Sequence, residues 1–126
     1  MKYFLSIFFL LPLMTIGQIN QVFKVKLIDF TNDKMPPPCG KIAAATTLKF
    51  QLSEQIDSLK KGQEILVIFS CPSDLGIKFI NNQEYLLTLC NPKETKEKTQ
   101  YSWSMWYKYE NEKLSKFWCK EIEKIK

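Results

Sequence analysis

The run Ile65-Leu66-Val67-Ile68-Phe69 is continuously apolar. A run of this length and composition is typical of a central β-strand that is covered on both faces. Pro72 follows closely and ends the strand, because proline has no backbone N–H to donate to a neighbouring strand. The run therefore predicts a buried strand over residues 65–69, around which the other elements assemble.

Further strands are predicted on both sides of this run, from the alternation of apolar with polar residues and from turn residues between the segments. They cover residues 23–27, 42–52, 85–90 and 101–109. Three prolines at 36–38 fix a rigid, extended connection between the first two strands. Five strands are about what a small closed or nearly closed barrel requires, so the chain is expected to be mainly β.

The C-terminal residues show a different period. Apolar side chains recur there at helical spacing, at Leu114, Trp118, Ile122 and Ile125. This spacing predicts an amphipathic C-terminal helix that lies on the barrel.

The first 17 residues have the layout of a secretory signal peptide: Lys2 gives a positive start, an apolar stretch runs from 3 to 14, and small residues precede Gln18. The stretch is too short to span a membrane as a helix, and no second one follows. Removing residues 1–17 from 126 leaves 109 for a single domain, 18–126. The chain is expected to be secreted or periplasmic, without a stable membrane span.

Four cysteines lie in this domain: Cys39, Cys71, Cys90 and Cys119. An even number in an oxidising compartment predicts two disulfides. A four-cysteine zinc site is disfavoured because such sites use closely spaced pairs of cysteines. Since Cys39 precedes the second predicted strand and Cys71 ends the third, an antiparallel pairing of these strands favours a Cys39–Cys71 bridge. The second bridge, Cys90–Cys119, then joins the fourth strand to the predicted helix.

The net charge of the chain is positive, with 18 lysines, 13 acidic residues and no arginine. Arginine is the residue best suited to bidentate capture of phosphate, so its absence argues against a nucleic-acid-binding role. Export argues against it as well. A solvated, lysine-rich surface is the preferred interpretation.

The segment around the central run carries a motif. It consists of Lys61-Gly62, the apolar run, Cys71, Phe79, Asn82 and Tyr85-Leu86. This pattern resembles the netrin-like module of tissue inhibitors of metalloproteinases and complement components. Asn82 stands where that module has glycine, and asparagine also visits left-handed backbone geometry. Pro72 follows the cysteine where glycine is usual.

The resemblance implies an OB-type five-stranded barrel with a packed helix. It does not imply metalloproteinase inhibition. Those inhibitors place the amine and carbonyl of an N-terminal cysteine on the catalytic zinc, whereas the expected first residue here is Gln18 and the first cysteine is Cys39.

Catalysis has little support in the sequence, and no cofactor or metal site is expected. The chain has no histidine, the commonest general base and metal ligand. Glu121 and Glu123 fall in a lysine-rich tail, which suggests a solvated face. Asp74 is a candidate site residue, but aspartate at this position is better explained as a turn residue. We expect a protein that is not an enzyme.

The aromatic strand at 101–109 is the most distinctive cluster. Its first face, expected to line the core, carries Tyr101, Trp103, Met105, Tyr107 and Tyr109. Trp106 lies on the wetter face, between Ser104 and Lys108. We expect it to be partly buried under the C-terminal helix, against Phe117 or Trp118, with one edge accessible. Trp106 and Tyr109 are the candidate binding residues, because aromatic side chains are enriched at interfaces.

These observations leave two classes of function open. The first is a protein-binding or inhibitor-like module with an unknown protein partner. The second is an accessory envelope protein that binds polysaccharide or another surface polymer through exposed aromatic side chains.

Overall fold

The computed structural model describes residues 21–40, 43–91 and 103–125. The elements are β1 (Gln21–Ile28), η1 (Asn32–Lys34), β2 (Ala43–Leu52), β3 (Glu64–Ser70), η2 (Pro72–Asp74), β4 (Glu84–Cys90), β5 (Trp103–Tyr107) and β6 (Lys116–Lys124). The four strands predicted over residues 23–27, 42–52, 65–69 and 85–90 are confirmed, the second from residue 43, since residue 42 lies outside the described residues. The predicted signal peptide, residues 1–17, lies outside the described residues. Within the described segments no helix is long and apolar enough to cross a membrane.

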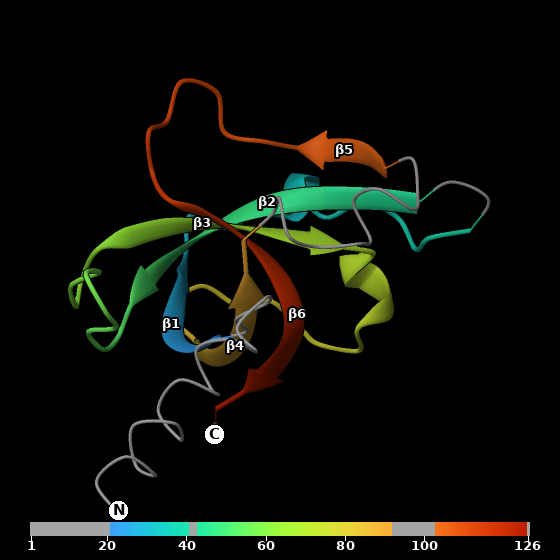
Figure 1. The fold of residues 1–126 in the computed structure, drawn as a ribbon. Helices are drawn as coiled ribbons and strands as arrows, with labels where there is room; N and C mark the ends of the chain where they lie inside the picture. Colours follow the sequence, from blue (N-terminus) through green and yellow to red (C-terminus); the bar gives the residue numbers. More distant parts are fainter. Residues whose placement is uncertain (1–20, 41–42, 92–102, 126) are drawn as a thin grey trace, which may run out of the picture.

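Five of the strands close into a barrel (Figure 1). Neighbouring strands follow the order β1-β4-β6-β3-β2, and an additional pairing of β1 with β2 closes the ring. β3 and β6 are parallel, and the other barrel neighbours are antiparallel. The strands β4-β1-β2-β3 lie side by side in the order of a Greek key.

The barrel interior is filled by large apolar side chains that alternate along the strands, as the two-residue period of a strand requires. The buried cluster consists of Phe23, Val25, Leu27, Leu48, Phe50, Leu52, Ile65, Val67, Phe69, Phe79, Tyr85, Leu87, Leu89 and Cys119. Ile65, Val67 and Phe69 of the central run belong to it, and Leu66 is buried as well, so that only Ile68 of the five is not fully buried.

β5 lies outside the barrel. It pairs in parallel with the first half of β2, whereas the second half of β2 pairs with β1. The expectation that the aromatic face of residues 101–109 lines the core is wrong, since Met105 is 42% exposed and Tyr107 and Tyr109 are only half-buried. The barrel closes without β5, so this face has no interior to fill. Residues 101 and 102 lie outside the described residues.

The predicted C-terminal amphipathic helix is also wrong. The segment Lys116–Lys124 is a strand, β6, inserted between β3 and β4 (Figure 1). It is therefore β6, and not β5, that completes the five-stranded barrel. Trp118 is buried in this strand and not on a helix.

A bulge in β6 interrupts the regular alternation of its side chains. Between Thr88 and Leu89 of β4, whose partners are Glu121 and Cys119, the register shifts and β6 contains one extra residue. Consequently Cys119 and Ile122, three positions apart, both contact the core. A bulge of this kind replaces the period of two with a local spacing of three, which is close to the helical period.

Three residues of the sequence motif, Phe79, Asn82 and Tyr85, hold the connection between β3 and β4. Tyr85 is buried, and its hydroxyl donates to the carbonyl oxygen of Lys78 and accepts from the backbone N–H of Ile80. Phe79 packs against the Tyr85 ring at 6.2 Å between centroids. Asn82 has φ 70°, a left-handed geometry that asparagine adopts more readily than most residues.

Candidate functional site

The connection between β1 and β2, residues 29–40, forms one wall of the candidate site. It passes through η1 and then through the prolines 36–38. Two hydroxyl groups hold it in place: Thr46 Oγ1 donates to the carbonyl oxygen of Lys34 at 2.6 Å, and Ser73 Oγ donates to that of Pro36 at 2.5 Å. Thr46 is buried on β2 and Ser73 lies in η2, so the connection is fastened to two separate elements.

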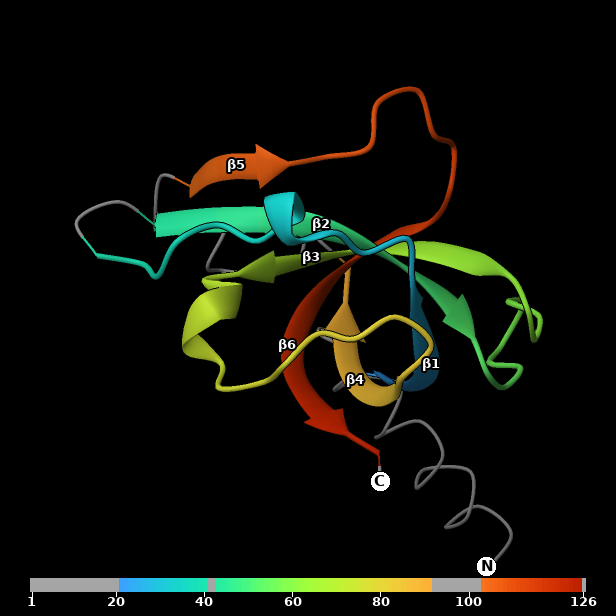
Figure 2. The same ribbon diagram turned by 180° about the vertical axis from the view of Figure 1, so that it is seen from behind.

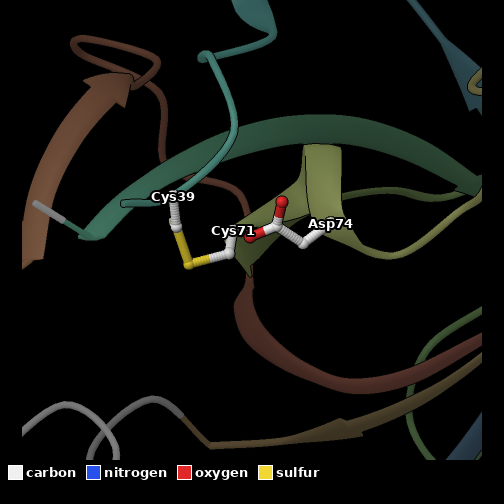
Figure 3. Close-up of side chains that lie close together, drawn as sticks. All are labelled: Cys39, Cys71 and Asp74. Carbon is white, nitrogen blue, oxygen red and sulfur yellow. A yellow bond between two sulfur atoms is a disulfide. The ribbon is translucent and has the colours of Figure 1, made fainter. Parts of the chain in front are cut away.

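A disulfide fastens the end of this connection. Cys39 is bonded to Cys71, as predicted, with Cα atoms 5.5 Å apart across 32 positions of sequence (Figure 3). Cys71 comes immediately after β3 and adopts φ 48°, in the left-handed region. The bridge thus joins the proline segment to the end of the central strand.

Asp74 lies beside this disulfide (Figure 3). In the described part of the chain, Cys39, Cys71 and Asp74 are grouped with their donor atoms within 4.8 Å of one another. The two sulfur atoms are joined in a disulfide and are not thiolates, so the group does not have the donors of a metal site. Asp74 itself is exposed, and its backbone N–H donates to the carbonyl oxygen of Cys71, which fits the predicted turn role.

Trp106 on β5 forms the opposite wall. Its indole Nε1 donates a hydrogen bond to the carbonyl oxygen of Asp33 at 2.9 Å. The side chain is 50% exposed. The predicted cover of Trp106 by a C-terminal helix, through Phe117 or Trp118, is not found; the residue is exposed, and its hydrogen bond goes to η1. Figure 2 shows η1, the blue-green turn, next to β2 and β5.

Between the two walls lies a cleft of about 230 Å³, lined by Pro37, Pro38, Ala44, Ser104 and Trp106. Ala44 and Ser104 are partners in the parallel pairing of β2 with β5 and form the floor. The lining is largely apolar; its polar side-chain groups are the Ser104 hydroxyl and the Trp106 indole N–H, which is bonded to Asp33. We call these five residues the Trp106 cleft.

Lys34 fastens the first wall to the segment that follows β5. Only 6% of this residue is exposed. Its Nζ donates to the carbonyl oxygen of Asp29 at 2.5 Å and to the Tyr109 hydroxyl at 3.0 Å, and it lies 3.3 Å from Asp29 Oδ2. Burial alone lowers the pKa of Lys34, but these hydrogen bonds and charges outweigh burial and raise it above the usual lysine value.

The second predicted binding residue, Tyr109, belongs to this structural cluster. Two ammonium groups lie near its ring, with Lys34 Nζ and Lys49 Nζ each 4.9 Å from its centroid. Lys49 in turn forms an ion pair with Glu112 at 2.8 Å. Burial raises the pKa of the Tyr109 hydroxyl, with the Lys34 hydrogen bond acting in the opposite direction. Tyr109 does not line the Trp106 cleft; it holds the cleft wall in position.

The other predicted bridge is not formed in the structure. Cys119 is a thiol whose Sγ lies 3.2 Å from the carbonyl oxygen of Glu121. Cys119 is paired with Leu89, whereas Cys90 is paired with Trp118, so the two cysteines alternate to opposite sides of the sheet. Burial raises the pKa of the Cys119 thiol to about 12, which leaves it protonated and unreactive at neutral pH.

Sequence reasoning identified Trp106 but not the rest of the cleft. Pro37 and Pro38 were recognised as a rigid connection without a binding role. Ala44 and Ser104 meet only because β2 and β5 pair across 60 positions of sequence, from Ala44 to Ser104. A parallel pairing between residues so far apart leaves no pattern in the local sequence. The proline run beside Cys39 did indicate a rigid surface segment.

Comparison of the chain with protein-family models, curated proteins and solved structures gave no match.

Proposed function

We propose that this chain is an exported, non-catalytic binding module, protein-binding or inhibitor-like, that takes an apolar side chain of a partner protein into the Trp106 cleft. The observation that carries the proposal is the half-exposed indole, oriented by its hydrogen bond to Asp33 and facing an apolar cleft. A tryptophan in a preformed pocket is the kind of residue that dominates binding energy at protein interfaces.

An OB-type barrel is part of this proposal. Its support is the closed five-stranded ring with a Greek-key order, the architecture that defines OB folds. OB folds bind their ligands through the loops between the first and second strands and between the last two. Here the first of these connections supplies Pro37 and Pro38, and the second supplies Ser104 and Trp106. Fold analogy is thus the basis for assigning binding to these two connections.

Netrin-like identity is likewise proposed. Its support is that the motif residues have consistent structural roles: Gly62 turns at φ 89° just before β3, and Asn82 turns at φ 70° just before β4. Phe79 and Tyr85 pack together in the core. None of these residues lines the cleft, so the motif accounts for the fold and leaves binding specificity to the two connections.

Rigidity of the cleft supports binding over catalysis. The proline wall is held by the Cys39–Cys71 bridge, by Ser73 and by Thr46, so little conformational freedom remains to be lost when a partner binds. The cleft residues include no acid, base or thiol. A disulfide is also compatible with export.

The test is a pull-down from native envelope and secreted fractions with the immobilised chain. We expect the wild-type chain to retain a specific protein and Trp106→Ala to retain at least about tenfold less, as for an interface hot spot. Val22→Ala is the matched control, since Val22 is 57% exposed on β1, outside the cleft. Equal retention by wild type and Trp106→Ala would contradict the proposal.

Polysaccharide binding is the second candidate, favoured by the same exposed indole, because a sugar ring can stack on an aromatic face. Protease treatment of the fraction before the pull-down distinguishes the two candidate functions. Loss of the retained material after protease supports a protein partner. Retained carbohydrate that survives protease, and that still depends on Trp106, supports the second candidate instead.

A further inference from the structure

Asp33 lies where the two walls of the Trp106 cleft meet. Its backbone carbonyl oxygen accepts the hydrogen bond from Trp106 Nε1 at 2.9 Å, and Asp33 is an exposed residue of η1. The carboxylate and this carbonyl belong to the same residue, so the negative charge of Asp33 lies close to the indole ring. One edge of the cleft thus carries an acidic group.

Asp74 lies at the end of the proline wall, where the disulfide fastens it. One of its carboxylate oxygens lies within 4.8 Å of both Cys39 Sγ and Cys71 Sγ (Figure 3). Cys39 follows Pro38 directly, and its Sγ accepts a hydrogen bond from the backbone N–H of Ala44, on the cleft floor, at 3.4 Å. The Asp74 carboxylate is therefore close to Pro38 and Ala44, two of the residues that line the cleft.

Neither carboxylate forms an ion pair with a lysine among the residues that the structure describes. The ion pairs of this part of the chain are Lys24–Glu54, Lys34–Asp29, Lys49–Glu112 and Lys108–Glu110. Lys34 and Lys108, which follow Asp33 and Trp106 closely in the sequence, each pair with another acidic residue. Although the chain has a formal net charge of +5, the described surroundings of the cleft leave two carboxylates available to a partner.

A β-bulge in β5 sets the position of Trp106. Ala45 of β2 pairs with Met105 and Thr46 pairs with Tyr107, so Trp106 is the extra residue of β5. Bulges of this kind redirect a side chain and are common beside functional sites. The indole is thus held by the bulge and by its hydrogen bond to η1, so the cleft and its acidic edge form one preformed site.

We propose that the partner segment places a lysine or arginine on each side of the apolar side chain that enters the Trp106 cleft, an inference that rests on the proposed function. One basic side chain pairs with Asp33 and the other with Asp74. The lining of the cleft holds no charged residue, so an ammonium group buried there would lose its hydration without compensation. At the two exposed aspartates the charges stay hydrated, and the apolar side chain is enclosed by a polar rim, as in other protein interfaces.

These rim charges contribute selectivity more than binding strength. Exposed ion pairs contribute little, so we expect the two pairs together to raise the affinity about three- to tenfold. A segment with acidic residues at the same places would be repelled and would bind more weakly than a neutral one. The preference should also decrease with ionic strength, because the Debye length falls from about 10 Å at 0.1 M salt to about 3 Å at 1 M.

NMR titration of the isotopically labelled, disulfide-intact chain with three synthetic peptides tests the proposal. Each peptide has blocked ends and a central leucine, flanked on both sides by lysine, by glutamine or by glutamate. The readout is the cross-peak of the Trp106 indole N–H, which is identified by its loss in Trp106→Phe. We expect the lysine peptide to bind at least about threefold more tightly than the glutamine peptide at about 50 mM NaCl, and the glutamate peptide to bind most weakly. At about 500 mM NaCl the difference should shrink.

A double variant assigns the preference to the two aspartates. Asp33→Asn with Asp74→Asn should remove the preference for lysine and leave the affinity for the glutamine peptide unchanged, which shows that the cleft is intact. Glu121→Gln with Glu123→Gln is the matched control, because these exposed residues lie on β6, outside the cleft, and their replacement changes the net charge by the same amount. The control should keep the full preference for the lysine peptide.

Equal binding of the three peptides would overturn the proposal, as would a preference that survives the loss of both aspartates. The absence of any shift of the Trp106 cross-peak up to about 10 mM peptide would overturn it as well. Trp106-dependent binding without a charge preference would leave the proposed function intact. The proposed function itself is decided by the pull-down, which uses native proteins and no synthetic peptide, so the two failures are distinguishable.

Discussion

Lys34 Nζ donates a hydrogen bond to the Tyr109 hydroxyl at 3.0 Å across 75 positions of sequence. The same ammonium group lies 3.3 Å from Asp29 Oδ2. One buried cation therefore joins the end of β1, η1 and the segment after β5. Because Trp106 is also hydrogen-bonded to η1, through Asp33, this cluster sets the position of both walls of the Trp106 cleft.

Tyr109→Phe is expected to destabilise the fold by about 1–2 kcal/mol. The variant keeps the ring contacts with Lys34 and Lys49 but removes the hydroxyl, so the buried Lys34 ammonium loses one acceptor. Urea denaturation followed by tryptophan fluorescence measures the change. Tyr107→Phe is the control, because the Tyr107 contact to Lys34 uses its ring and survives the change. Equal losses in both variants would show that the Tyr109 hydroxyl contributes nothing specific.

Four barrel strands were predictable from their residues, β3 from its continuous apolar run and the other three from the alternation of apolar with polar residues. β6 was not, because its bulge places Cys119 and Ile122 three positions apart on the core side, and a single sequence does not reveal a bulge. The location of β5 outside the barrel was also not predictable from the sequence. An edge strand outside a barrel and a strand within it show the same alternation, and only the closure of β1 on β2 decides between them.

The residues of the candidate site likewise include some that were predictable from the sequence and some that were not. Trp106 was predictable because a tryptophan between Ser104 and Lys108 breaks the polar face of its strand. The role of Tyr109 was not, since its contacts with Lys34 and Asp29 come from residues 75 and 80 positions away. The Cys39–Cys71 bridge was predictable from the antiparallel pairing of β2 with β3.

Removing that bridge tests its contribution to the cleft wall. Cys39→Ala with Cys71→Ala should destabilise the chain by about 3 kcal/mol, since the bridge closes a loop of 32 positions. A reducing agent should then have no further effect on the double variant. Urea midpoints with and without reductant give both results, and a double variant as stable as the wild type would contradict the expectation.

The backbone at Cys71 gives this experiment a second readout. Its φ of 48° is strained for alanine and natural for glycine. Replacing Cys71 by glycine in place of alanine, with Cys39→Ala constant, should therefore recover up to about 1 kcal/mol. A lower stability for the glycine version would show that this backbone geometry is not kept once the bridge is gone.

Cys119 predicts a loss of stability at alkaline pH. Burial raises the pKa of its thiol from 9.0 to about 12 in the folded chain. Between these values the unfolded chain releases the proton and the folded chain retains it, so the free energy of unfolding falls as pH rises from about 9 to about 12. Below pH 9 the thiol contributes no pH dependence.

Lysine and tyrosine groups also titrate in this pH range. The effect of Cys119 is therefore measured as the difference in stability loss between wild type and Cys119→Ala. Unfolding in urea at about pH 8 and about pH 11 should show that wild type loses on the order of 2 kcal/mol more than Cys119→Ala. Alkylation should modify Cys119 only after denaturation, because the protonated buried thiol is a poor nucleophile. Parallel losses in both proteins, or rapid alkylation of the native chain at Cys119, would contradict the burial of this thiol.

The two tryptophans Trp118 and Trp106 test the corrected C-terminal architecture. Trp118 is buried on β6, so Trp118→Ala should cost about 3–5 kcal/mol through the cavity that it leaves. Trp106 is half-exposed on an edge strand outside the barrel, and Trp106→Ala should cost only about 1–2 kcal/mol, mainly through the hydrogen bond to Asp33. Both variants lose the same side-chain atoms, so each controls for the other in urea denaturation. If the aromatic strand were the fifth barrel strand and the tail a helix lying on it, the order of the two losses would be reversed or the losses would be equal.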